Sequence, residues 1–357
     1  MINKEPPAPA GPVFVEPLDV FWGSAADRAT SQLGALPLLG GAAAAASVAV
    51  WRFAPLSRTT IPAAGLHDLI RSLPADQARE AGGAVANWNR PRRFAGVPAG
   101  RAGLMGIINV NNDSFFPGSR FPISDAAARQ AHRLIEEGAD ILDVGGQSTR
   151  TGGRIVSIDQ ELESTLPAVA GAASLGVPVS IDTLRPLVAR MNTRAGAAVI
   201  NDISGRLPPD QQSPRAWIVG DMVGNPVTMQ RWPRTGYGVF DVYRRLERRI
   251  AVLENAGYPR SSIAVDPGFG FGKALVHNQA IIQHLPLFLG LGTAIVVGVS
   301  RKGSLGYLSG ERAVEQRMPA SLGAALACLR GGATILRVHD VAATRQAVQV
   351  FQSFIDT

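Results

Sequence analysis

Eight short apolar runs recur between residues 104 and 340 of this 357-residue chain, and each carries or ends in polar residues. They occupy residues 104–110, 141–144, 177–181, 197–200, 226–229, 263–265, 294–299 and 334–338. The polar residues in or directly after them are Asn109, Asp143, Asp182, Asn201, Gln230, Asp266, Ser300-Arg301-Lys302, Arg337 and His339. The runs are almost continuously apolar and often β-branched, without alternation. This pattern predicts strands that are buried on both faces.

Amphipathic stretches of helical length separate most of the runs, at residues 125–137, 159–173, 240–256 and 278–285. Eight strand-then-helix units in about 250 residues match the count and size of a (β/α)8 TIM barrel. An open doubly wound sheet is the competing architecture. Catalytic groups of such barrels lie at the C-terminal ends of the strands, where this chain has its Asn, Asp, Lys, Arg and His. We therefore predict an α/β fold with a (β/α)8 barrel.

The run that ends at Asp266 continues as Pro-Gly-Phe-Gly-Phe-Gly-Lys, up to Lys273. A loop with three glycines and two aromatic residues can bring its backbone and rings against a flat ligand beside the carboxylate. Asp-Pro-Gly is also an ordinary turn sequence. The interpretation as a binding loop depends on the same arrangement recurring at the other strand ends.

Seven segments in this region resemble, in order, the motifs of the dihydropteroate synthase family. They include Met-Gly-Ile-Ile-Asn-Val at 105–110, Asp-Val-Gly-Gly-Gln-Ser-Thr-Arg at 143–150, Ser-Ile-Asp-Thr at 180–183 and Ile-Asn-Asp-Ile-Ser-Gly at 200–205. The others lie at 266–273, 298–302 and 337–341, so that the resemblance covers about residues 103–357. It implies a transferase that joins a dihydropterin-methyl diphosphate to the amine of para-aminobenzoate and releases diphosphate with the help of Mg²⁺.

The residue types suit these substrates. A pterin edge carries several N–H donors, which acidic or amide groups in a concave site can accept, and a guanidinium can stack on the ring. A departing diphosphate needs cations and neutral donors. The resemblance implies catalytic roles for Asn109, Lys302, Arg337 and His339, with Asn109 also facing Mg²⁺. It implies substrate-binding roles for Asp143, Thr149, Arg150, Asp182, Asn201, Asp266, Phe271, Lys302, Arg337 and His339.

Simpler roles exist for some of these residues. Asp182 and Asn201 could start turns or cap helices, as Asp-Thr and Asn-Asp sequences often do. His339 could be a helix-start residue that is hydrogen-bonded to the backbone. These local roles do not explain why five polar groups lie together at strand ends of one barrel. The five are Asp182, Asn201, Asp266, Lys302 and Arg337.

The chain departs from the family pattern at Asn111, Asn112, Pro117, Gln147, Thr151 and Gln230. Pro117 stands where a second carboxylate is expected, and Gln230 stands near the fifth run in place of a usual His. The changes fall in two loops and around the site that the resemblance implies for the arylamine substrate. A modified arylamine, as in tetrahydromethanopterin-type pathways, or a catalytically weak, regulatory pterin-binding paralogue would fit them as alternatives. A corrinoid-dependent methyltransferase is disfavoured, because methyl transfer has no need of the anion-binding groups near Arg301 and Arg337.

Composition is that of a globular protein. The net charge of +7 suits an anionic diphosphate, and no motif for nucleic acids accompanies it. The single Cys328 excludes an internal disulfide, which favours a reducing compartment, and we expect a cytoplasmic protein. From the resemblance we also expect a homodimer.

The first hundred residues form a separate region. We predict a flexible arm at 1–12, a small domain of unknown role at 13–87, a basic linker at 88–101 and the pterin-binding barrel at 102–357. Residues 33–51 carry no charge, which raises the question of a membrane span. Their glycines, alanines and Pro37 make them only weakly hydrophobic, so we predict a packed segment of the small domain.

Overall fold

The computed structural model describes residues 11–53, 56–110, 123–147, 156–209, 216–224 and 238–355. The chain divides into two compact units. The first contains Met1–Pro91, Pro286–Gly292 and Gln352–Thr357, and the second contains Arg92–Leu285 and Thr293–Phe351. Most of the predicted N-terminal arm, residues 1–10, lies outside the described residues.

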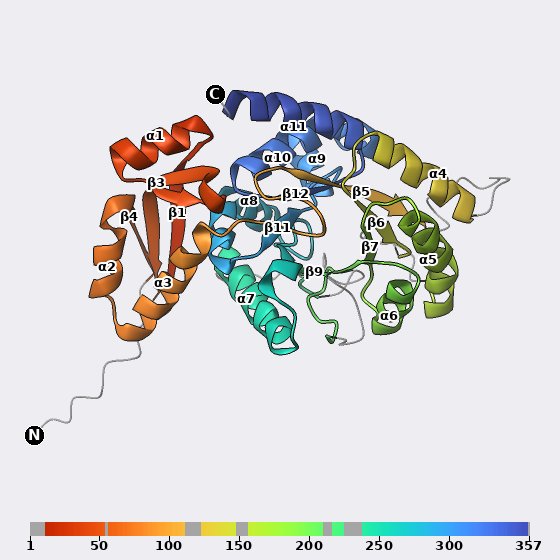
Figure 1. Cartoon of the computed structure of the whole chain (residues 1–357), viewed down its shortest axis with the longest axis horizontal. Coiled ribbons are helices and arrows are strands. Elements are labelled where there is room, and N and C mark those ends of the chain that lie inside the picture. The colour runs from red at the N-terminus through yellow and green to blue at the C-terminus, as the bar shows by residue number, and fades with distance from the viewer. Residues whose placement is uncertain are drawn as a thin grey trace, which may run out of the picture. The chain divides into compact units, whose positions relative to one another are not determined.

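An antiparallel sheet organises the first unit (Figure 1). Strand β1 (Val13–Trp22) pairs along the whole of β3 (Ala43–Arg52), and β3 also pairs with β2 (Leu36–Leu38) and β4 (Ser57–Pro62). The helices of this unit are α1 (Ser24–Leu33), α2 (Leu66–Ser72) and α3 (Ala75–Trp88). Much of the uncharged stretch 33–51 is therefore a central strand. Within the described ranges, no helix combines the length and the apolarity that crossing a membrane requires.

Eight parallel strands close into a barrel in the second unit, which confirms the predicted (β/α)8 architecture. In chain order they are β5 (Gly103–Asn109), β6 (Ile141–Gly145), β7 (Val179–Asp182), β8 (Val199–Asp202), β9 (Ala216–Gly220), β10 (Ile263–Asp266), β11 (Ala294–Val297) and β12 (Ile335–Val338). The ring closes where β12 pairs with β5, in a register that places Arg337 opposite Met105.

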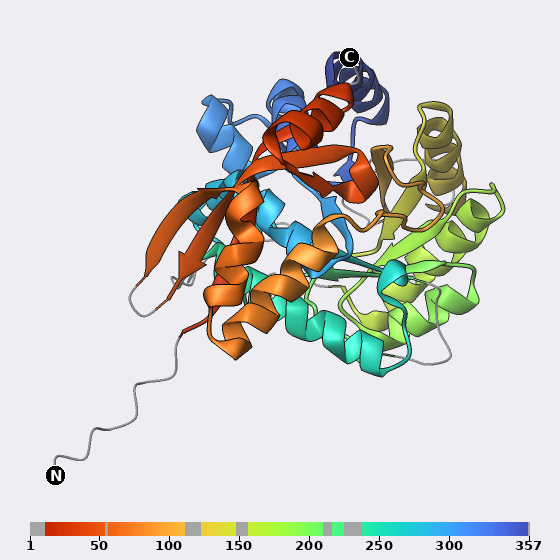
Figure 2. The ribbon, with the colours of Figure 1, turned by 60° about the vertical axis from the view of Figure 1, so that its left-hand side comes forward.

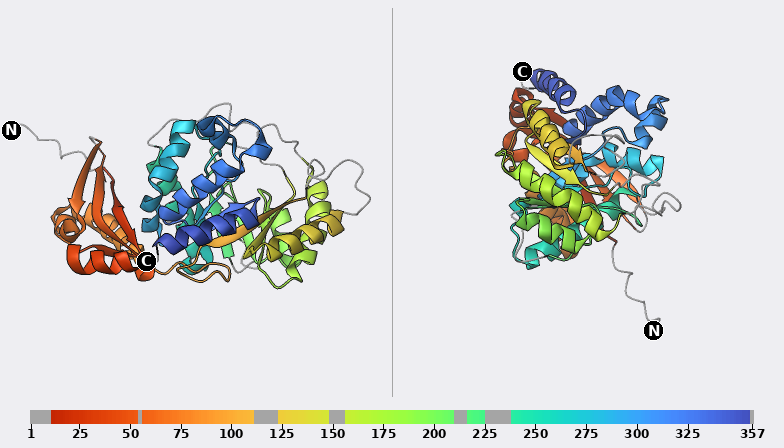
Figure 3. Two further views of the ribbon diagram at one scale, coloured as in Figure 1. Left: turned by 90° about the horizontal axis from the view of Figure 1, so that it is seen from above. Right: turned by 90° about the vertical axis from the view of Figure 1, so that its right-hand side faces the viewer.

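Helices cover the outside of the strands (Figure 2 and Figure 3). They are α4 (Ile123–Glu136), α5 (Ile158–Ala173), α6 (Pro186–Arg194), α7 (Val239–Asn255), α8 (Leu275–Gln283), α9 (Gly303–Ser309), α10 (Met318–Arg330) and α11 (Val341–Ile355). Local sequence sets several of their starts. Ser157 and Gln160 form a capping box that begins α5, and Pro186 is the first residue of α6.

The predicted fifth strand, 226–229, is wrong. The fifth barrel strand is β9, Ala216–Gly220, and it pairs with β8 and β10. Residues 226–229, together with Gln230, lie outside the described residues. Trp217-Ile218-Val219 is more apolar than residues 226–229, which include Pro226 and Thr228, so composition also favoured the true strand. Pairing with both neighbouring strands decides it.

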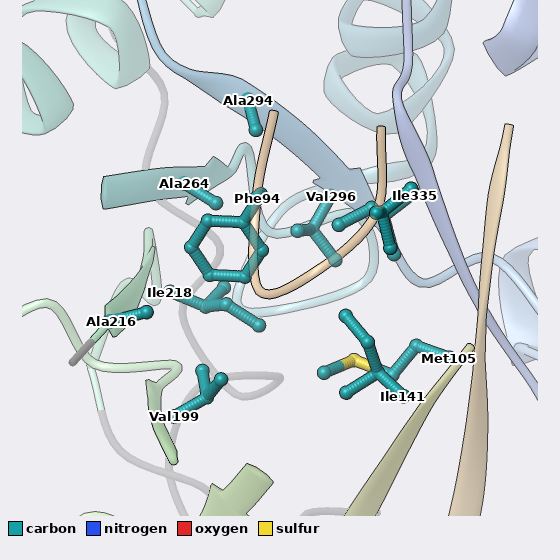
Figure 4. Close-up of a cluster of buried hydrophobic side chains, with 11 residues drawn as sticks. Phe94, Met105, Ile141, Val199, Ala216, Ile218, Ala264, Ala294, Val296 and Ile335 are labelled. Atoms are coloured by element: carbon teal, nitrogen blue, oxygen red, sulfur yellow. The ribbon is translucent and has the colours of Figure 1, made fainter. Parts of the chain in front are cut away.

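A layer of apolar side chains fills the barrel near the N-terminal ends of its strands (Figure 4). Met105, Ile141, Val199 and Ile335 belong to it, and so do Phe94 and Val97, which form an isolated β-bridge before the first barrel strand. Both lie in the predicted basic linker, yet they are 3% and 4% exposed. The arginines of this segment suggested a solvated connection, but burial of each such apolar side chain stabilises the fold by about 1.5–3 kcal/mol.

Candidate active site

Side-chain alternation places the polar residues inside the barrel, one layer above the apolar one. Successive residues of a strand point to opposite faces, so a residue two positions after an inward-facing side chain also faces inward. Each of four apolar residues of the core layer is followed two residues later by a polar one. The pairs are Ile141 and Asp143, Val199 and Asn201, Ala264 and Asp266, and Ile335 and Arg337. The strand register therefore assembles one polar layer.

Arg337 lies at the centre of this layer. Its Nε donates to Asp143 Oδ2 at 2.5 Å, and its second guanidinium branch donates to Asp182 Oδ2 at 2.7 Å. Asn201 Nδ2 also donates to Asp143 Oδ2, at 3.2 Å. Asp143 is fully buried, and its carboxylate orients the side chains of Arg337 and Asn201 through these hydrogen bonds. One planar guanidinium thus connects two carboxylates from neighbouring strands, which a point-charge ammonium could not do with the same geometry.

Two acceptor groups remain for a donor-rich ligand. Asn201 Oδ1 is buried and has no hydrogen-bond partner in the described part of the protein. Asp266 uses one oxygen to accept from the backbone N–H of Gly268, at 2.8 Å. An orphaned buried acceptor costs free energy unless a ligand or water supplies a donor. The layer therefore matches a flat ligand with several N–H groups along one edge.

The glycine-rich loop after β10 places the aromatic ring of Phe271 beside the amine of Lys302, which follows β11. Lys302 Nζ lies 3.9 Å from the centroid of the Phe271 ring and donates to the carbonyl of Phe269. Gly270 has φ +81°, and a Cβ at this position would lie 2.9 Å from Lys302 Cδ. Glycine is required here by both conformation and space.

Burial and neighbouring charges shift the pKa values of these groups. Burial raises the pKa of Asp182 to about 7, although the charge of Arg337 opposes the shift. Burial also raises the pKa of Asp266. Burial lowers the pKa of Lys302 to about 7, against the charge of Asp266. For Arg337, burial opposes the charged form, but the charges of Asp143 and Asp182 prevail and raise its pKa.

These shifts imply a narrow pH optimum. Below pH 7 Asp182 becomes protonated and loses its strength as an acceptor, and above pH 7 Lys302 loses its charge. We expect kcat/KM to peak near pH 7 and to fall on both sides, by at most about tenfold per pH unit on each limb. A kinetic pH profile measures this. The alkaline limb should be absent in Lys302→Met, and a flat profile between pH 6 and 8.5 in the unmodified protein would contradict the assignment.

The structure locates the remaining residues that the sequence singled out. Asn109 is half-buried at the end of β5. The backbone N–H of His339 donates to Ser300 Oγ at 3.2 Å, and its ring Nδ1 lies 3.0 Å from the same hydroxyl oxygen. It precedes α11 by two residues, and one partner of its ring is the Ser300 side chain, which follows β11. Thr149 and Arg150 lie outside the described residues, as do Asn111, Asn112, Pro117 and Thr151.

Sequence reasoning missed Asp221 beside this layer, and it did not pair Lys273 with Asp221 or Ser300 with His339. Asp221 directly follows the true fifth strand. The apolar run Trp217-Ile218-Val219 before it was the available signal, because it repeats the pattern of the other strand ends. Lys273 had been noticed only as the end of the glycine-rich loop.

Comparison with known proteins agrees with this geometry. A family model described as "Pterin binding enzyme" matches residues 105–339. The chain therefore belongs to the pterin-binding enzyme family. Within it, the relatives are dihydropteroate synthases. Those of Neisseria meningitidis serogroup B and Escherichia coli K12 are 39% and 38% identical over 261 and 256 residues, which is 70% of this chain and 92% and 90% of those proteins.

Solved structures extend the likeness to the fold. The Xanthomonas albilineans dihydropteroate synthase with 4-aminobenzoic acid has a TM-score of 0.67 and 38% identity, and the match covers 72% of this chain and 94% of that one. The Burkholderia cenocepacia enzyme complexed with 7,8-dihydropteroate has a TM-score of 0.64 and 41% identity, covering 71% and 91%. The family match begins two residues after the start of β5 and ends just after β12, so it covers the barrel strands but neither α11 nor the N-terminal sheet.

Proposed function

We propose that this protein is a dihydropteroate synthase, a transferase that condenses a dihydropterin-methyl diphosphate with para-aminobenzoate and releases diphosphate. The observation that carries the proposal is the convergence of Asp182, Asn201, Asp266, Lys302 and Arg337 at one end of the barrel of a pterin-binding family member. This set combines acceptors for a pterin edge, a guanidinium that can stack on the ring, and cations for a diphosphate.

The reaction breaks the C–O bond between the pterin methylene and the diphosphate, whose oxygen keeps the bonding electrons. The amine lone pair then forms the C–N bond, and the nitrogen loses a proton to solvent. Negative charge grows on the leaving group, so a preorganised guanidinium such as Arg337 stabilises the transition state more than the bound substrate. Asp182, Asn201 and Asp266 hold the pterin so that its methylene faces the amine.

A diphosphate-release assay tests the proposal. The protein is supplied with a dihydropterin-methyl diphosphate and a panel of arylamines that includes para-aminobenzoate and modified arylamines. We expect diphosphate and a pteroate product with para-aminobenzoate. Pterin binding without product from any arylamine would instead favour a regulatory paralogue. A clear preference for another arylamine would reassign the second substrate and connect it to the departures at Asn111, Asn112, Pro117 and Thr151.

Magnesium fits the donor set at the end of β5. Mg²⁺ retains several of its waters and binds few protein oxygens beside those of a substrate diphosphate. Among the described residues, no group of three or more His, Cys, Asp or Glu side chains is placed to hold a metal ion. We assign the amide oxygen of Asn109 as the protein ligand of Mg²⁺. The ion would neutralise charge on the diphosphate.

Removal of this amide tests the magnesium assignment. In Asn109→Ala we expect the Mg²⁺ concentration for half-maximal diphosphate-ester binding to rise about tenfold, equivalent to ~1.4 kcal/mol. Calorimetric titrations over a range of Mg²⁺ concentrations measure it. Asn255→Ala, at the exposed end of α7, is the matched control and should behave as the unmodified protein. An unchanged Mg²⁺ dependence in Asn109→Ala would exclude the residue as a ligand.

The single cysteine, Cys328, is buried, and its burial raises the pKa of the thiol, so it has the character of a core residue. A cytoplasmic homodimer stays a prediction. Sedimentation of the purified protein would measure the oligomeric state.

A further inference from the structure

Lysine is rare in this chain, and its positions are informative. Of 35 basic residues, only Lys4, Lys273 and Lys302 are lysines. The other 32 basic residues (35 − 3) are arginines. Two of the three lysines, Lys273 and Lys302, lie beside the glycine-rich loop after β10. Since an ammonium is a compact donor and a guanidinium is a broad planar one, these are positions where the smaller group has a specific task.

Lys273 is enclosed by oxygen atoms. Its side chain is 5% exposed, and its Nζ lies 3.0 Å from Asp221 Oδ2. The same ammonium donates to three backbone carbonyls, those of Asp221 at 2.6 Å, Gly268 at 3.0 Å and Phe271 at 3.3 Å. The far side of Asp221 is held by Arg245, whose guanidinium donates to both carboxylate oxygens at 2.6 and 3.0 Å. Arginine thus takes the outer, two-donor position, and lysine takes the inner one.

The loop around this ammonium has no spare room. Gly268 has φ +72°, and a Cβ there would lie 1.9 Å from the carbonyl oxygen of Asp221 and 2.9 Å from Lys273 Nζ. At Gly272, with φ +67°, a Cβ would lie 2.2 Å from the carbonyl oxygen of Val223. The loop backbone is therefore pressed against residues 221–223 after β9. A larger cationic head at position 273 would have to displace backbone.

The loop determines the position of two groups of the proposed pterin site. Gly268 N–H donates to Asp266, and Phe271 packs with Ile203 and Met222 under Lys302. A second attachment, independent of charge, fixes the same loop, because Asn278 accepts from Gly270 N–H at 2.7 Å and donates to the carbonyl of Lys273 at 3.1 Å.

We propose that Lys273 is a positioning residue for the pterin substrate: held by Asp221, it gathers three loop carbonyls and thereby sets the placement of Phe271 and Asp266. The inference rests on the proposed function. Its specific claim is that the shape of the ammonium matters as well as its charge. The lysine would then act on pterin binding and leave the arylamine end of the site unaffected.

The substitution Lys273→Arg separates shape from charge. We expect KM for the dihydropterin-methyl diphosphate to rise at least tenfold, with KM for para-aminobenzoate within about twofold of the unmodified value. Lys4→Arg is the same substitution at a position outside this loop and should leave both KM values unchanged. If Lys273→Arg keeps the pterin KM of the unmodified protein, the lysine only neutralises Asp221 and the proposal is overturned. Equal increases in both KM values would overturn it as well, because they would indicate a general loss of structure.

Two further variants provide a second test. One is Lys273→Met alone, and the other combines Lys273→Met with Asp221→Asn. Removal of the ammonium alone leaves a buried carboxylate with only one of its two cations, so thermal unfolding should occur at a lower temperature. The double variant should regain unfolding temperature but keep the raised pterin KM, because the loop carbonyls still lack their donor. Recovery of the pterin KM in the double variant would overturn the proposal.

Asn278→Ala covers the case in which the Lys273 variants do not fold. It loosens the same loop without altering a charge, and we expect the same selective rise in pterin KM. An unchanged pterin KM would show that loop placement does not control binding. Failure of the proposed function itself is distinguishable, since the unmodified protein would then release no diphosphate at all.

Discussion

Arg337→Ala should slow turnover of the dihydropterin-methyl diphosphate by roughly 10²–10³-fold, the usual loss for one preorganised donor to a developing negative charge. Binding of a free pterin that lacks the phosphates should change far less, because the guanidinium contributes most as charge builds on the leaving group. Steady-state kinetics of diphosphate release and calorimetry with a free pterin measure the two quantities on the same preparation.

The controls follow from the position of Arg337 between Asp143 and Asp182. Arg337→Lys keeps a positive charge but cannot donate to both carboxylates with one planar fork, so it should show an intermediate rate. Arg330→Ala removes an exposed arginine from the end of α10 and should be neutral. Thermal unfolding of each variant checks that the fold is intact. Losses of equal size in turnover and in free-pterin binding would reduce Arg337 to a stacking residue.

Asp182→Ala should weaken pterin binding by about 1–3 kcal/mol, since the ring donors lose a buried acceptor. This corresponds to roughly 5- to 150-fold in the dissociation constant. Arg337 would also lose one of its two carboxylate partners, so the variant should lower the turnover of the diphosphate ester too. Calorimetric titration with a free pterin isolates the first effect from the second.

Asp182→Asn retains the volume and one acceptor oxygen, and should bind pterin with an affinity between those of the unmodified protein and Asp182→Ala. Asp159→Ala, in the exposed first turn of α5, is the matched control for loss of a carboxylate. Pterin affinity that is the same in Asp182→Ala and in the unmodified protein would remove Asp182 from the site.

Local sequence was sufficient for the architecture and for most of the proposed site. Strands buried on both faces are continuous apolar runs. This property identified seven of the eight barrel strands before it was known which strands pair with one another. The polar residues that we selected at their ends lie where the structure forms its polar layer, because the period of two residues along a strand fixes which side chains face inward.

Tertiary structure decided what depends on contacts between distant segments. The fifth strand was misplaced because we selected residues 226–229 instead of the earlier apolar run, and pairing with β8 and β10 identifies Ala216–Gly220 as the strand. Phe94 and Val97 entered the core although arginines surround them in sequence, because an apolar barrel end has to be closed. Arg337 meets Asp143 across 194 positions of chain, and Lys273 meets Asp221 across 52. The order in which the strands close the ring creates these contacts, and no local pattern in the sequence carries that order.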